Sequence, residues 1–588
     1  MNNSKNSIIA KIMRSYAFTF MMIELADSLS MLVDGLIVSN LLGPTAMASV
    51  GLGNTSFQMV SLFCGIFAIG IQSCCSSAMG SGNHEQTQRF FSSGLTIVAA
   101  VMLLCTVFGF IFRGPLCVLL GAAREDVELY STLHRYLTGW FFGIPGFIGF
   151  TVLSPIVTLD GNKKCVTAAT VVQSVFNVGF DLFSMKVLKW DMLGAGLATG
   201  IGFDLALLVL LSNFLRKRSA FRIRFSLPDF SSLLKIVKIG TPRLTKYGCK
   251  MLAPLLINRT IIAIGGCTAM AAMSVKSSIG NFCFVAANGF AESVNLMSQV
   301  FYSEKDKAAL KSTVQTAARA NIIVCTVFAA LMLVGARLLA GFFMTAGTEE
   351  YDLTVTMMCC LALSIALYGL NAEVANYLQG TRKMVPTHLQ TVSHRLLFPA
   401  VSTFVLGSLM GTEGLFIALP VSEVLVLLAY IIAALLHGRG NAAGDAVLLL
   451  PNDFGYTEDD SIALNLETID EVIGISEKIN EFCLRRGIDR RRAYYAALCV
   501  EETAGNVVDH GFKKDNKTHS CEVRVMIEDD DVILRIRDDC RYFNMKERYE
   551  LLKSKDVSSN IGIKLVYGIA KDINYVNILN TNTLIIRI

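Results

Sequence analysis

Long apolar runs separated by short polar breaks fill the chain from its first residues to Leu436. A membrane-spanning helix needs about 20 consecutive, mostly apolar residues, and about twelve runs in this sequence reach that length. The pattern predicts an all-α polytopic membrane region of twelve transmembrane helices. The expected spans are residues 15–40, 46–78, 90–115, 126–157, 163–185, 193–214, 236–262, 268–300, 312–336, 352–379, 384–410 and 414–436.

The pattern changes near residue 440. A linker rich in Gly, Asn and Ala, expected at 441–457, is followed by shorter segments with strand-like and helix-like periods. We expect an α/β sandwich over residues 458–588, about 130 residues, which is long enough for a core of its own. The expected strands are 446–450, 461–466, 521–528, 531–538 and the segments between 570 and 588, and the expected helices are 468–486, 490–510 and 561–569.

Charge is distributed in a way that supports this division. Up to Gly444 the chain carries 32 Lys and Arg against 21 Asp and Glu, and after it 20 against 26. The first part has too few charges to cover the surface of a soluble protein of its size. The expected surroundings of this part are therefore membrane lipid. Composition excludes a wholly soluble protein, and we expect no nucleic-acid partner.

Basic residues gather in alternate loops of the membrane part. Because Lys and Arg are enriched in cytoplasmic loops, this bias predicts a multi-pass protein of the cell membrane (inner or plasma membrane) with both termini in the cytoplasm. The residues on the expected cytoplasmic side are Lys5, Lys11, Arg14, Arg89, Lys163, Lys164, the basic residues between Arg216 and Lys238, Lys305, Lys307, Lys311, Arg382, Lys383 and Arg439.

The membrane part also repeats itself. Gly43-Pro-Thr-Ala-Met-Ala48 returns as Gly266-Cys-Thr-Ala-Met-Ala271, at an offset of 223 residues that also aligns a second short motif and a polar loop. Two repeats of six spans that start on the same side predict two parallel six-helix bundles, at 1–222 and 223–440. Such bundles facing one another are typical of an alternating-access carrier.

Several motifs resemble the multidrug and toxic compound extrusion (MATE) family. They are Val33-Asp-Gly-Leu-Ile-Val-Ser-Asn-Leu-Leu-Gly43, Asn177-Val-Gly-Phe-Asp181, and the repeated Thr-Ala-Met-Ala that opens the second helix of each half. The resemblance covers about residues 10–437. It implies a secondary active antiporter for multidrug or xenobiotic efflux, which exports small organic compounds in exchange for H⁺ or Na⁺.

Acidic residues inside expected spans are candidates for the coupling site, because an ionised carboxylate in the bilayer is costly without a function. Asp34 and Asp181 lie about 19 and 18 residues from the starts of spans 1 and 5, so both are ~28 Å along their helices. Asn177 precedes Asp181 by one helical turn, and Tyr136 and Thr199 are expected nearby. Two carboxylates in a low dielectric cannot both ionise cheaply, which favours sharing a proton or Na⁺. Alternatively, each acid alone could cap a helix end, but in MATE proteins the matching positions form the cation-coupling site.

The second bundle carries charges that suggest a substrate cavity. Lys250, Lys276 and Glu373 lie well inside expected spans. A positive cavity wall would repel cationic drugs, so an anionic or zwitterionic substrate stays open.

The tail contains Val500-Glu-Glu-Thr-Ala-Gly-Asn-Val-Val-Asp-His510, which places Glu502, Asn506 and His510 on one expected helix face. This stretch resembles the N box of the gyrase, heat-shock chaperone, histidine kinase and mismatch-repair (GHKL) ATPase superfamily, a Bergerat-type fold, and most closely its anti-sigma-factor serine kinases. The resemblance implies Glu502 as catalytic base and Asn506 as the ligand of Mg²⁺ in Mg-ATP.

Two further motifs extend the likeness. Asp538 matches the adenine-reading aspartate and Gly562 the second glycine motif, which with His510 completes the expected ATP-binding set. Cys540 and Asn560 stand where that superfamily has glycines that let the backbone approach phosphate. A tail that has lost ATP and only binds a protein therefore stays an alternative.

Three functions compete. The first is a cation-coupled exporter with a regulatory nucleotide-binding tail. The second is a membrane sensor whose carrier fold controls a serine/threonine kinase-like tail acting on an anti-sigma-type switch protein, and the third is a lipid-linked flippase. No G-x-x-x-x-G-K-[ST] motif occurs, so the sequence offers no P-loop motor for transport.

Overall fold

The computed structural model describes most of the chain. The backbone is described except at residues 1–2, 43, 82, 121, 123–126, 217–218, 225–228, 345, 439–442, 452, 458, 467, 469, 513–518, 529, 543–560 and 580. Within helices, the described side chains exclude those of residues 3–8, 27, 30–36, 39–40, 44–45, 47–48, 51, 54–55, 243, 251, 255, 267, 270–271, 274, 277–278, 443 and 561. The predicted site residue Asp34 and the motif residue Asn560 therefore lie outside the described residues.

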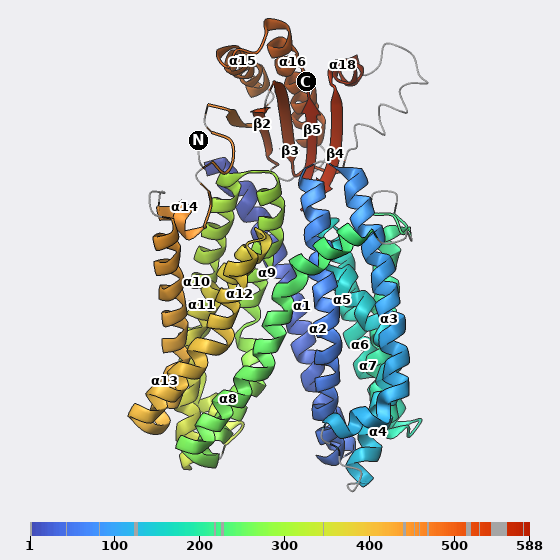
Figure 1. Ribbon diagram of the computed structural model, residues 1–588, viewed down its shortest axis with the longest axis vertical. Coiled ribbons are helices and arrows are strands. Elements are labelled where there is room, and N and C mark those ends of the chain that lie inside the picture. Colours follow the sequence, from blue (N-terminus) through green and yellow to red (C-terminus); the bar gives the residue numbers. More distant parts are fainter. Residues whose placement is uncertain are drawn as a thin grey trace.

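The first half of the membrane part is an all-helical bundle (Figure 1). Its helices are α1 (Asn3–Leu42), α2 (Pro44–Gly80), α3 (His84–Leu120), α4 (Val127–Phe142), α5 (Ile144–Leu159), α6 (Lys163–Lys186) and α7 (Asp191–Phe214).

One expected span, 126–157, is broken in two. Helices α4 and α5 meet at Gly143 with a bend of 53°. Pro145 sits in the first turn of α5, where its missing N–H costs nothing. A side chain at Gly143 would collide with the backbone of Gly200, so the bend also allows a close approach to α7.

The second half forms another helical bundle. Its helices are α8 (Phe230–Cys283), α9 (Val285–Ser303), α10 (Lys307–Gly341), α11 (Glu349–Gly380), α12 (Met384–Val392), the π-helix η1 (Ser393–Leu397) and α13 (Phe398–His437).

Two glycines interrupt the long helices α8 and α13. Gly266 has φ 63° and ψ −158°, and Gly411 has φ 67° and ψ −141°, a backbone region that essentially only glycine enters. Both lie where the apolar pattern predicts a boundary between two spans. Among the described residues, eight helices are long and apolar enough to cross a membrane, or nine if α4 and α5 together form one span.

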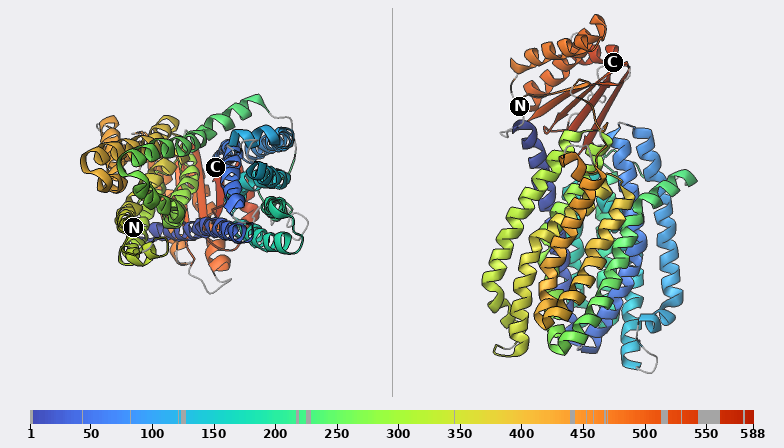
Figure 2. Two further views of the ribbon diagram at one scale, coloured as in Figure 1. Left: turned by 90° about the horizontal axis from the view of Figure 1, so that it is seen from below. Right: turned by 60° about the vertical axis from the view of Figure 1, so that its left-hand side comes forward.

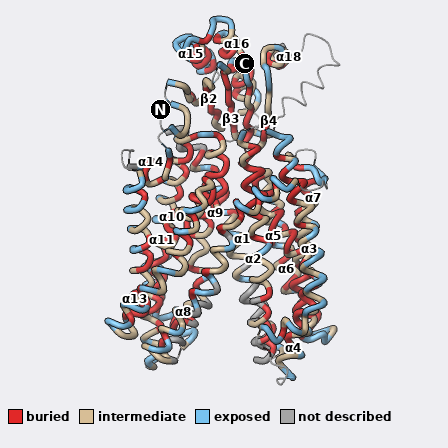
Figure 3. The backbone as a smooth tube through the Cα atoms, viewed as in Figure 1, coloured by how far each residue is buried: buried red, intermediate tan, exposed pale blue. Residues whose placement is uncertain are grey.

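The two bundles meet at the end that carries the tail and diverge away from it (Figure 1). Glycines make this contact close, because a side chain at Gly70 or Gly240 would strike the backbone of Ile236 or Ile66 across the interface. Arg382 adds hydrogen bonds from the second bundle to the backbone oxygen and hydroxyl of Ser73. Buried residues are accordingly dense at this end (Figure 3).

The tail is a small domain with a five-stranded antiparallel sheet in the order β1-β2-β3-β5-β4. Its elements are α14 (Ala443–Val447), β1 (Ser461–Leu466), α15 (Asp470–Arg485), α16 (Arg490–Asn506), the π-helix η2 (Val507–Gly511), β2 (Cys521–Glu528), β3 (Asp531–Asp538), α18 (Ile561–Ile569), β4 (Asp572–Ile578) and β5 (Thr581–Arg587). One predicted strand is wrong: residues 446–450 continue the short helix α14 into a turn, with Leu450 N–H bonded to the Asp445 carbonyl.

The two faces of the sheet differ. Val523, Val525, Leu534 and Ile536 alternate along β2 and β3 and form one apolar core with α15 and α16, which cover that face (Figure 2). The opposite face carries arginines and lies toward the membrane bundles. A sheet with a polar outer face would ordinarily be exposed to water, and here it is covered by protein.

Candidate functional site

The first bundle contains a buried polar cluster on α6 and α7. The Asn177 side-chain amide donates a hydrogen bond to the Thr199 hydroxyl oxygen over 3.1 Å, and the Thr199 hydroxyl lies 3.2 Å from the Ala195 carbonyl oxygen. Asn177 is 3% and Thr199 9% exposed. The structure thus brings together two of the residues that the sequence assigned to the coupling site.

Asp181 and Tyr136 belong to the same region. Asp181 lies one turn beyond Asn177 on α6, and its side chain is fully buried. The Tyr136 ring on α4 packs beside Gly53 of α2, where any side chain would collide with it. Asp34 stays a prediction for this site, since its side chain is outside the described residues.

Small residues on α7 explain how these helices come so close. A Cβ at Gly196 would strike the Tyr136 carbonyl oxygen, and one at Gly194 would strike the Ser184 hydroxyl. Small residues at helix contacts let backbones approach within the membrane, so α4 and α6 both pack tightly on α7. The glycines therefore set the positions of Tyr136 and Asn177 relative to Thr199.

A second buried polar cluster lies in the other bundle, and the sequence reasoning missed its central acid. The Glu423 carboxylate accepts a hydrogen bond from the Asn371 amide at 2.7 Å and lies 3.1 Å from His394 Nε2. His394 is in the π-helix η1, a distortion found frequently at functional sites. Glu423 lies in an expected span, so the cost of a buried acid could have identified it.

The three predicted cavity residues of this bundle occupy different environments. Lys250 is exposed, Lys276 is half-buried and Glu373 is 2% exposed. Lys276 interacts electrostatically with Glu423, which links it to the Glu423 cluster. The polar centre of the second bundle is therefore built around Glu423 and not around Glu373 alone.

The nucleotide-binding motifs come together in the tail. Glu502 of α16 faces Gly562 of α18, where any side chain would collide with the Glu502 carboxylate. The Asn506 amide donates to the Glu502 carbonyl oxygen at 2.5 Å. Two motifs that are 60 residues apart in sequence thus meet at one point, as the GHKL resemblance implies.

His510 departs from the expected alignment with Glu502 and Asn506. The helix changes to π geometry over Val507–Gly511, so residues after Asn506 no longer follow the α-helical i+4 spacing. The His510 side chain is 70% exposed and lies 3.5 Å from the Asp509 carboxylate. A continuous three-residue face is therefore not formed.

Asp538 ends strand β3 on the helix-covered side of the sheet. Its Oδ1 accepts hydrogen bonds from the Asn582 amide at 2.8 Å and from the Cys540 backbone N–H at 2.9 Å. Burial raises the pKa of Asp538, and these hydrogen bonds oppose that rise. Cys540, which replaces a glycine of the GHKL pattern, packs against Gly511 at the end of η2.

The largest cluster of buried charge joins the tail to the second bundle. Two acids flank the turn between α9 and α10, and three arginines project from β2 and β3; we call these five residues the docking cluster. Arg535 lies 2.8 Å from both Glu304 and Asp306, Arg524 lies 2.5 Å from Asp306, and Arg537 pairs with Glu304.

All five side chains are at most 7% exposed. The two neighbouring carboxylates raise the pKa of Arg535 against the opposing effect of desolvation. Asp306 also accepts a hydrogen bond from the Ala309 N–H at 3.0 Å, which caps α10 and fixes the turn. A buried cluster of this kind holds one specific geometry, because any displacement leaves charges unpaired in a low dielectric.

Helix α14 adds a second attachment near the expected linker. Asp445 lies 3.1 Å from Lys307 and 2.7 Å from Lys311 on α10. Although desolvation opposes the change, these two lysines lower the pKa of Asp445. The Tyr377 hydroxyl donates to the Leu448 carbonyl oxygen at 3.0 Å, so the segment after α13 is packed on the second bundle.

Two helical bundles with buried polar centres, joined to a sheet domain with ATPase-type motifs, define a membrane carrier with an ATPase-like tail. The chain belongs to the MatE family, which it matches over residues 20–183 and 248–405, more than half of its length. Residues 467–588 match the histidine kinase-like ATPase domain family. Both resemblances noted in the sequence are confirmed, and the protein is a multi-span membrane protein.

Relatives of known sequence agree with this assignment. A probable multidrug resistance protein NorM of Pseudomonas putida is 24% identical over 332 residues, covering 54% of this chain and 70% of that protein. An FAD transporter of Shewanella oneidensis is 25% identical over 221 residues, covering 35% of this chain and 47% of that protein.

Solved structures share the fold of the membrane part. An outward-facing multidrug resistance MATE family transporter of the MOP superfamily aligns with a TM-score of 0.66 at 19% identity, covering 72% of this chain and 94% of that chain. The bent form of the Vibrio cholerae MATE transporter VcmN gives a TM-score of 0.68 at 19% identity, covering 76% and 98%. At these identities the likeness concerns the fold alone.

Proposed function

We propose that the protein is a secondary transporter that exports small organic compounds in antiport with H⁺ or Na⁺ and is regulated by its ATPase-like tail. The observation that carries this proposal is the buried carboxylate of Asp181 beside the Asn177–Thr199 pair in a carrier fold. An acid inside a membrane bundle is costly unless it exchanges a cation, and an amide and a hydroxyl next to it supply neutral oxygen ligands.

The proposed topology is twelve crossings in the cell membrane with both termini in the cytoplasm. The glycine breaks at Gly266 and Gly411 support it, because each divides a long helix at an expected boundary between two spans. The bend at Gly143 falls inside one expected span, so α4 and α5 together count as one crossing. Basic residues concentrate at the tail end of the bundles, which the positive-inside bias assigns to the cytoplasm. The contact between the bundles then closes the cytoplasmic side, which corresponds to an outward-facing carrier.

The proposed substrates include anionic or zwitterionic organic compounds. Lys276 and His394 stand near Glu423 in the second bundle, so this polar centre is not uniformly negative. One relative is named as an FAD transporter. One solved relative from Pyrococcus furiosus, with a TM-score of 0.66, is described as having a binding pocket of reverse polarity that suggests a different function.

The test of transport is a flux assay with the full-length protein in proteoliposomes. A preset pH or Na⁺ gradient should drive accumulation of organic test compounds, both cationic and anionic, above the level of empty liposomes. If uptake stays at the level of empty liposomes both with and without a gradient, the transporter proposal is wrong. Adding Mg-ATP on the tail side should change the rate without replacing the need for the ion gradient.

The second candidate function is a sensor whose tail is a serine/threonine kinase acting on an anti-sigma-type switch protein. The contact between Glu502 and Gly562 favours it, since the expected catalytic base adjoins the second glycine motif at the start of α18. In this case the full-length protein should phosphorylate its partner and show no gradient-driven flux. Gradient-driven flux without phosphoryl transfer to the partner would exclude the sensor function.

Binding of Mg-ATP to the tail can be measured directly on the full-length protein. We expect Asn506→Ala to weaken Mg-ATP binding by about tenfold or more, because a charge-assisted contact to Mg²⁺ or phosphate contributes roughly 1.5–3 kcal/mol. Glu477→Gln on the exposed surface of α15 is the matched control and should bind as the wild type does. Wild-type protein without measurable Mg-ATP affinity would instead favour a tail that only docks a protein.

A further inference from the structure

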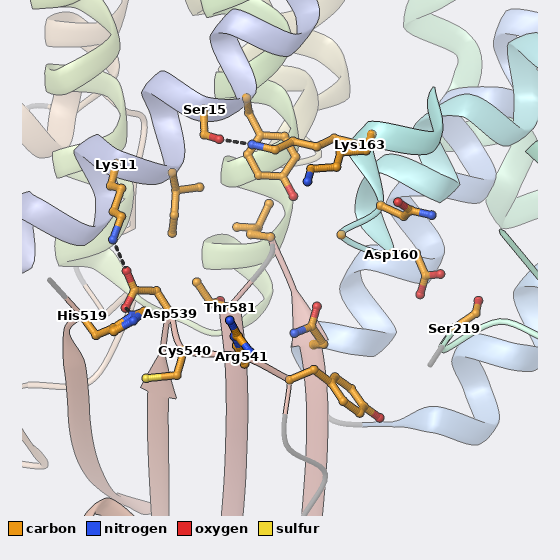
Figure 4. Close-up of a pocket in the computed structure, with 18 of the residues that line it drawn as sticks. Lys11, Ser15, Asp160, Lys163, Ser219, His519, Asp539, Cys540, Arg541 and Thr581 are labelled. Carbon is orange, nitrogen blue, oxygen red and sulfur yellow. Dashed lines mark hydrogen bonds and ion pairs between the residues drawn. The ribbon is translucent and has the colours of Figure 1, made fainter. Parts of the chain in front are cut away.

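A cavity of about 750 Å³ lies between the tail and the first bundle (Figure 4). Its walls come from α1, from the turn between α5 and α6 with the start of α6, and from the segment after α7. On the tail side they come from His519 before β2 and from the ends of β3, β4 and β5. Its volume falls in the range of pockets that hold small molecules. It is separate from the polar clusters inside the bundles, since none of their residues line it.

The cavity walls carry more positive than negative charge. Five lining residues are cationic and two are acidic. The cationic residues are Lys11, Lys163, Lys164, Arg216 and Arg541, and the acidic residues are Asp160 and Asp539.

Both acids are already engaged by donors of the protein itself. Asp160 accepts hydrogen bonds from the Asn213 amide at 2.8 Å and the Ala220 N–H at 2.9 Å. Burial raises the pKa of Asp160 against the effect of these bonds. Asp539 pairs with Lys11 (Figure 4) and lies 3.1 Å from His519 Nδ1.

By contrast, several of the cationic lining residues hydrogen-bond to neutral groups. Lys163 contacts the Ser15 hydroxyl (Figure 4), which is neutral. Arg216 lies 3.4 Å from the neutral amide oxygen of Asn213, and its charge also acts on the Asp160 carboxylate. Among the described residues, neither Lys164 nor Arg541 has a carboxylate within ion-pair distance. The wall therefore presents positive charge from the first bundle on one side and from the tail on the other, and its two acids, Asp160 and Asp539, are already held by donors of the protein.

We propose that this cavity binds a phosphate-bearing anion that bridges Lys164 and Arg216 of the first bundle to Arg541 of the tail. A guanidinium group presents parallel N–H donors that match phosphate oxygens, and a lysine ammonium adds a compact charge. The phosphate belongs either to a soluble phosphorylated compound or to the headgroup of an anionic lipid at the membrane surface. This inference does not depend on whether the protein exports compounds.

The position of the cavity gives the bound anion a structural consequence. The tail is fixed to the second bundle by the docking cluster and touches the first bundle around the cavity. An anion in the cavity therefore ties the first bundle to the second through the tail. It stabilises the arrangement in which the bundles meet at the tail end.

The test uses full-length protein in nanodiscs, without Mg²⁺ so that the nucleotide motifs are not engaged. In discs of phosphatidylcholine alone, inorganic pyrophosphate is titrated and binding is followed by calorimetry. In a second arm, discs containing phosphatidic acid are compared with phosphatidylcholine discs by native mass spectrometry of retained lipid. Binding in the first arm identifies a soluble ligand, and selective retention in the second identifies a lipid headgroup.

The decisive comparison is between two double variants that remove the same charge. Lys164→Gln with Arg541→Gln should weaken binding of the ligand by about tenfold or more, since two charge-assisted contacts are lost. Lys186→Gln with Arg485→Gln, which lies outside the cavity, should bind as the wild type does. All four side chains are exposed, so both variants are expected to fold, and thermal unfolding checks this. Equal affinity of the two double variants, or no binding in either arm, overturns the proposal.

Discussion

Neutralising the two acids of the docking cluster is expected to release the tail from the second bundle. The double variant Glu304→Gln with Asp306→Asn keeps the shape of both side chains but leaves Arg535 and its neighbours buried without a counter-charge. Breaking a buried ion pair from one side costs about 3–5 kcal/mol, which corresponds to a change of roughly 10²–10³ or more in the docked-to-undocked ratio. Limited trypsin digestion of the protein in nanodiscs should remove the tail correspondingly faster.

The matched control changes two acids at the far end of the same bundle. Glu349→Gln with Glu350→Gln lies in the first turn of α11, away from the tail, and should leave the digestion rate unchanged. Adding Arg535→Met to the docking-cluster variant should recover part of the loss, because it removes the most central unpaired charge. Digestion at the wild-type rate in the Glu304→Gln and Asp306→Asn variant would mean that the cluster does not hold the tail.

The helices of the membrane part were predictable because lipid imposes one simple requirement. Every span must satisfy its backbone hydrogen bonds internally and present apolar side chains, so apolar runs locate helices well. The bend at Gly143 was not predictable, since it depends on the contact of this glycine with Gly200 more than 50 residues away. The strand expected at 446–450 failed because an apolar run of that length fits a short buried helix equally well.

The docking cluster shows a different limit of sequence reasoning. Arg535 and Arg537 alternate with apolar residues along β3, and this pattern ordinarily indicates a strand with one face in water. Their acidic partners lie more than 200 residues earlier, in a loop whose charges also fit a solvated turn. Only the packing of the tail on the bundle distinguishes a buried charged face from an exposed one.

Within the candidate sites, local spacing predicted some positions and tertiary contacts decided the rest. Asn177 and Asp181 follow from helical periodicity on α6, and the meeting of Asn177 with Thr199 follows from the family resemblance. Glu423 was missed because the second bundle offers several buried polar residues, and nothing in their spacing ranks one above another. The exposure of His510 could not be foreseen, since a π-helix has no reliable signature in the sequence.

Replacing Asp181 by Asn is expected to abolish ion-coupled transport. The amide has nearly the same size as the carboxylate, so the packing of α6 on α7 should survive, but it can neither release a proton nor supply a negative charge to Na⁺. Antiport requires that the same site binds the ion in one state of the carrier and releases it in the other. In proteoliposomes, we expect gradient-driven flux to fall to the level of empty liposomes, a loss of about 100-fold or more for a coupling free energy of roughly 3 kcal/mol.

The control for this variant is another aspartate whose side chain is exposed. Asp191→Asn at the start of α7 removes an acid that lies 3.4 Å from Arg135 and is 56% exposed, so flux should remain near the wild-type value. Asn177→Ala should lie between the two, because it removes one neutral ligand and the hydrogen bond to Thr199 but leaves the carboxylate in place. Full gradient-driven flux in Asp181→Asn would show that the buried acid of α6 takes no part in coupling. A selective loss in a variant of Glu423 would then transfer the coupling role to the second bundle, where His394 is the partner of that acid.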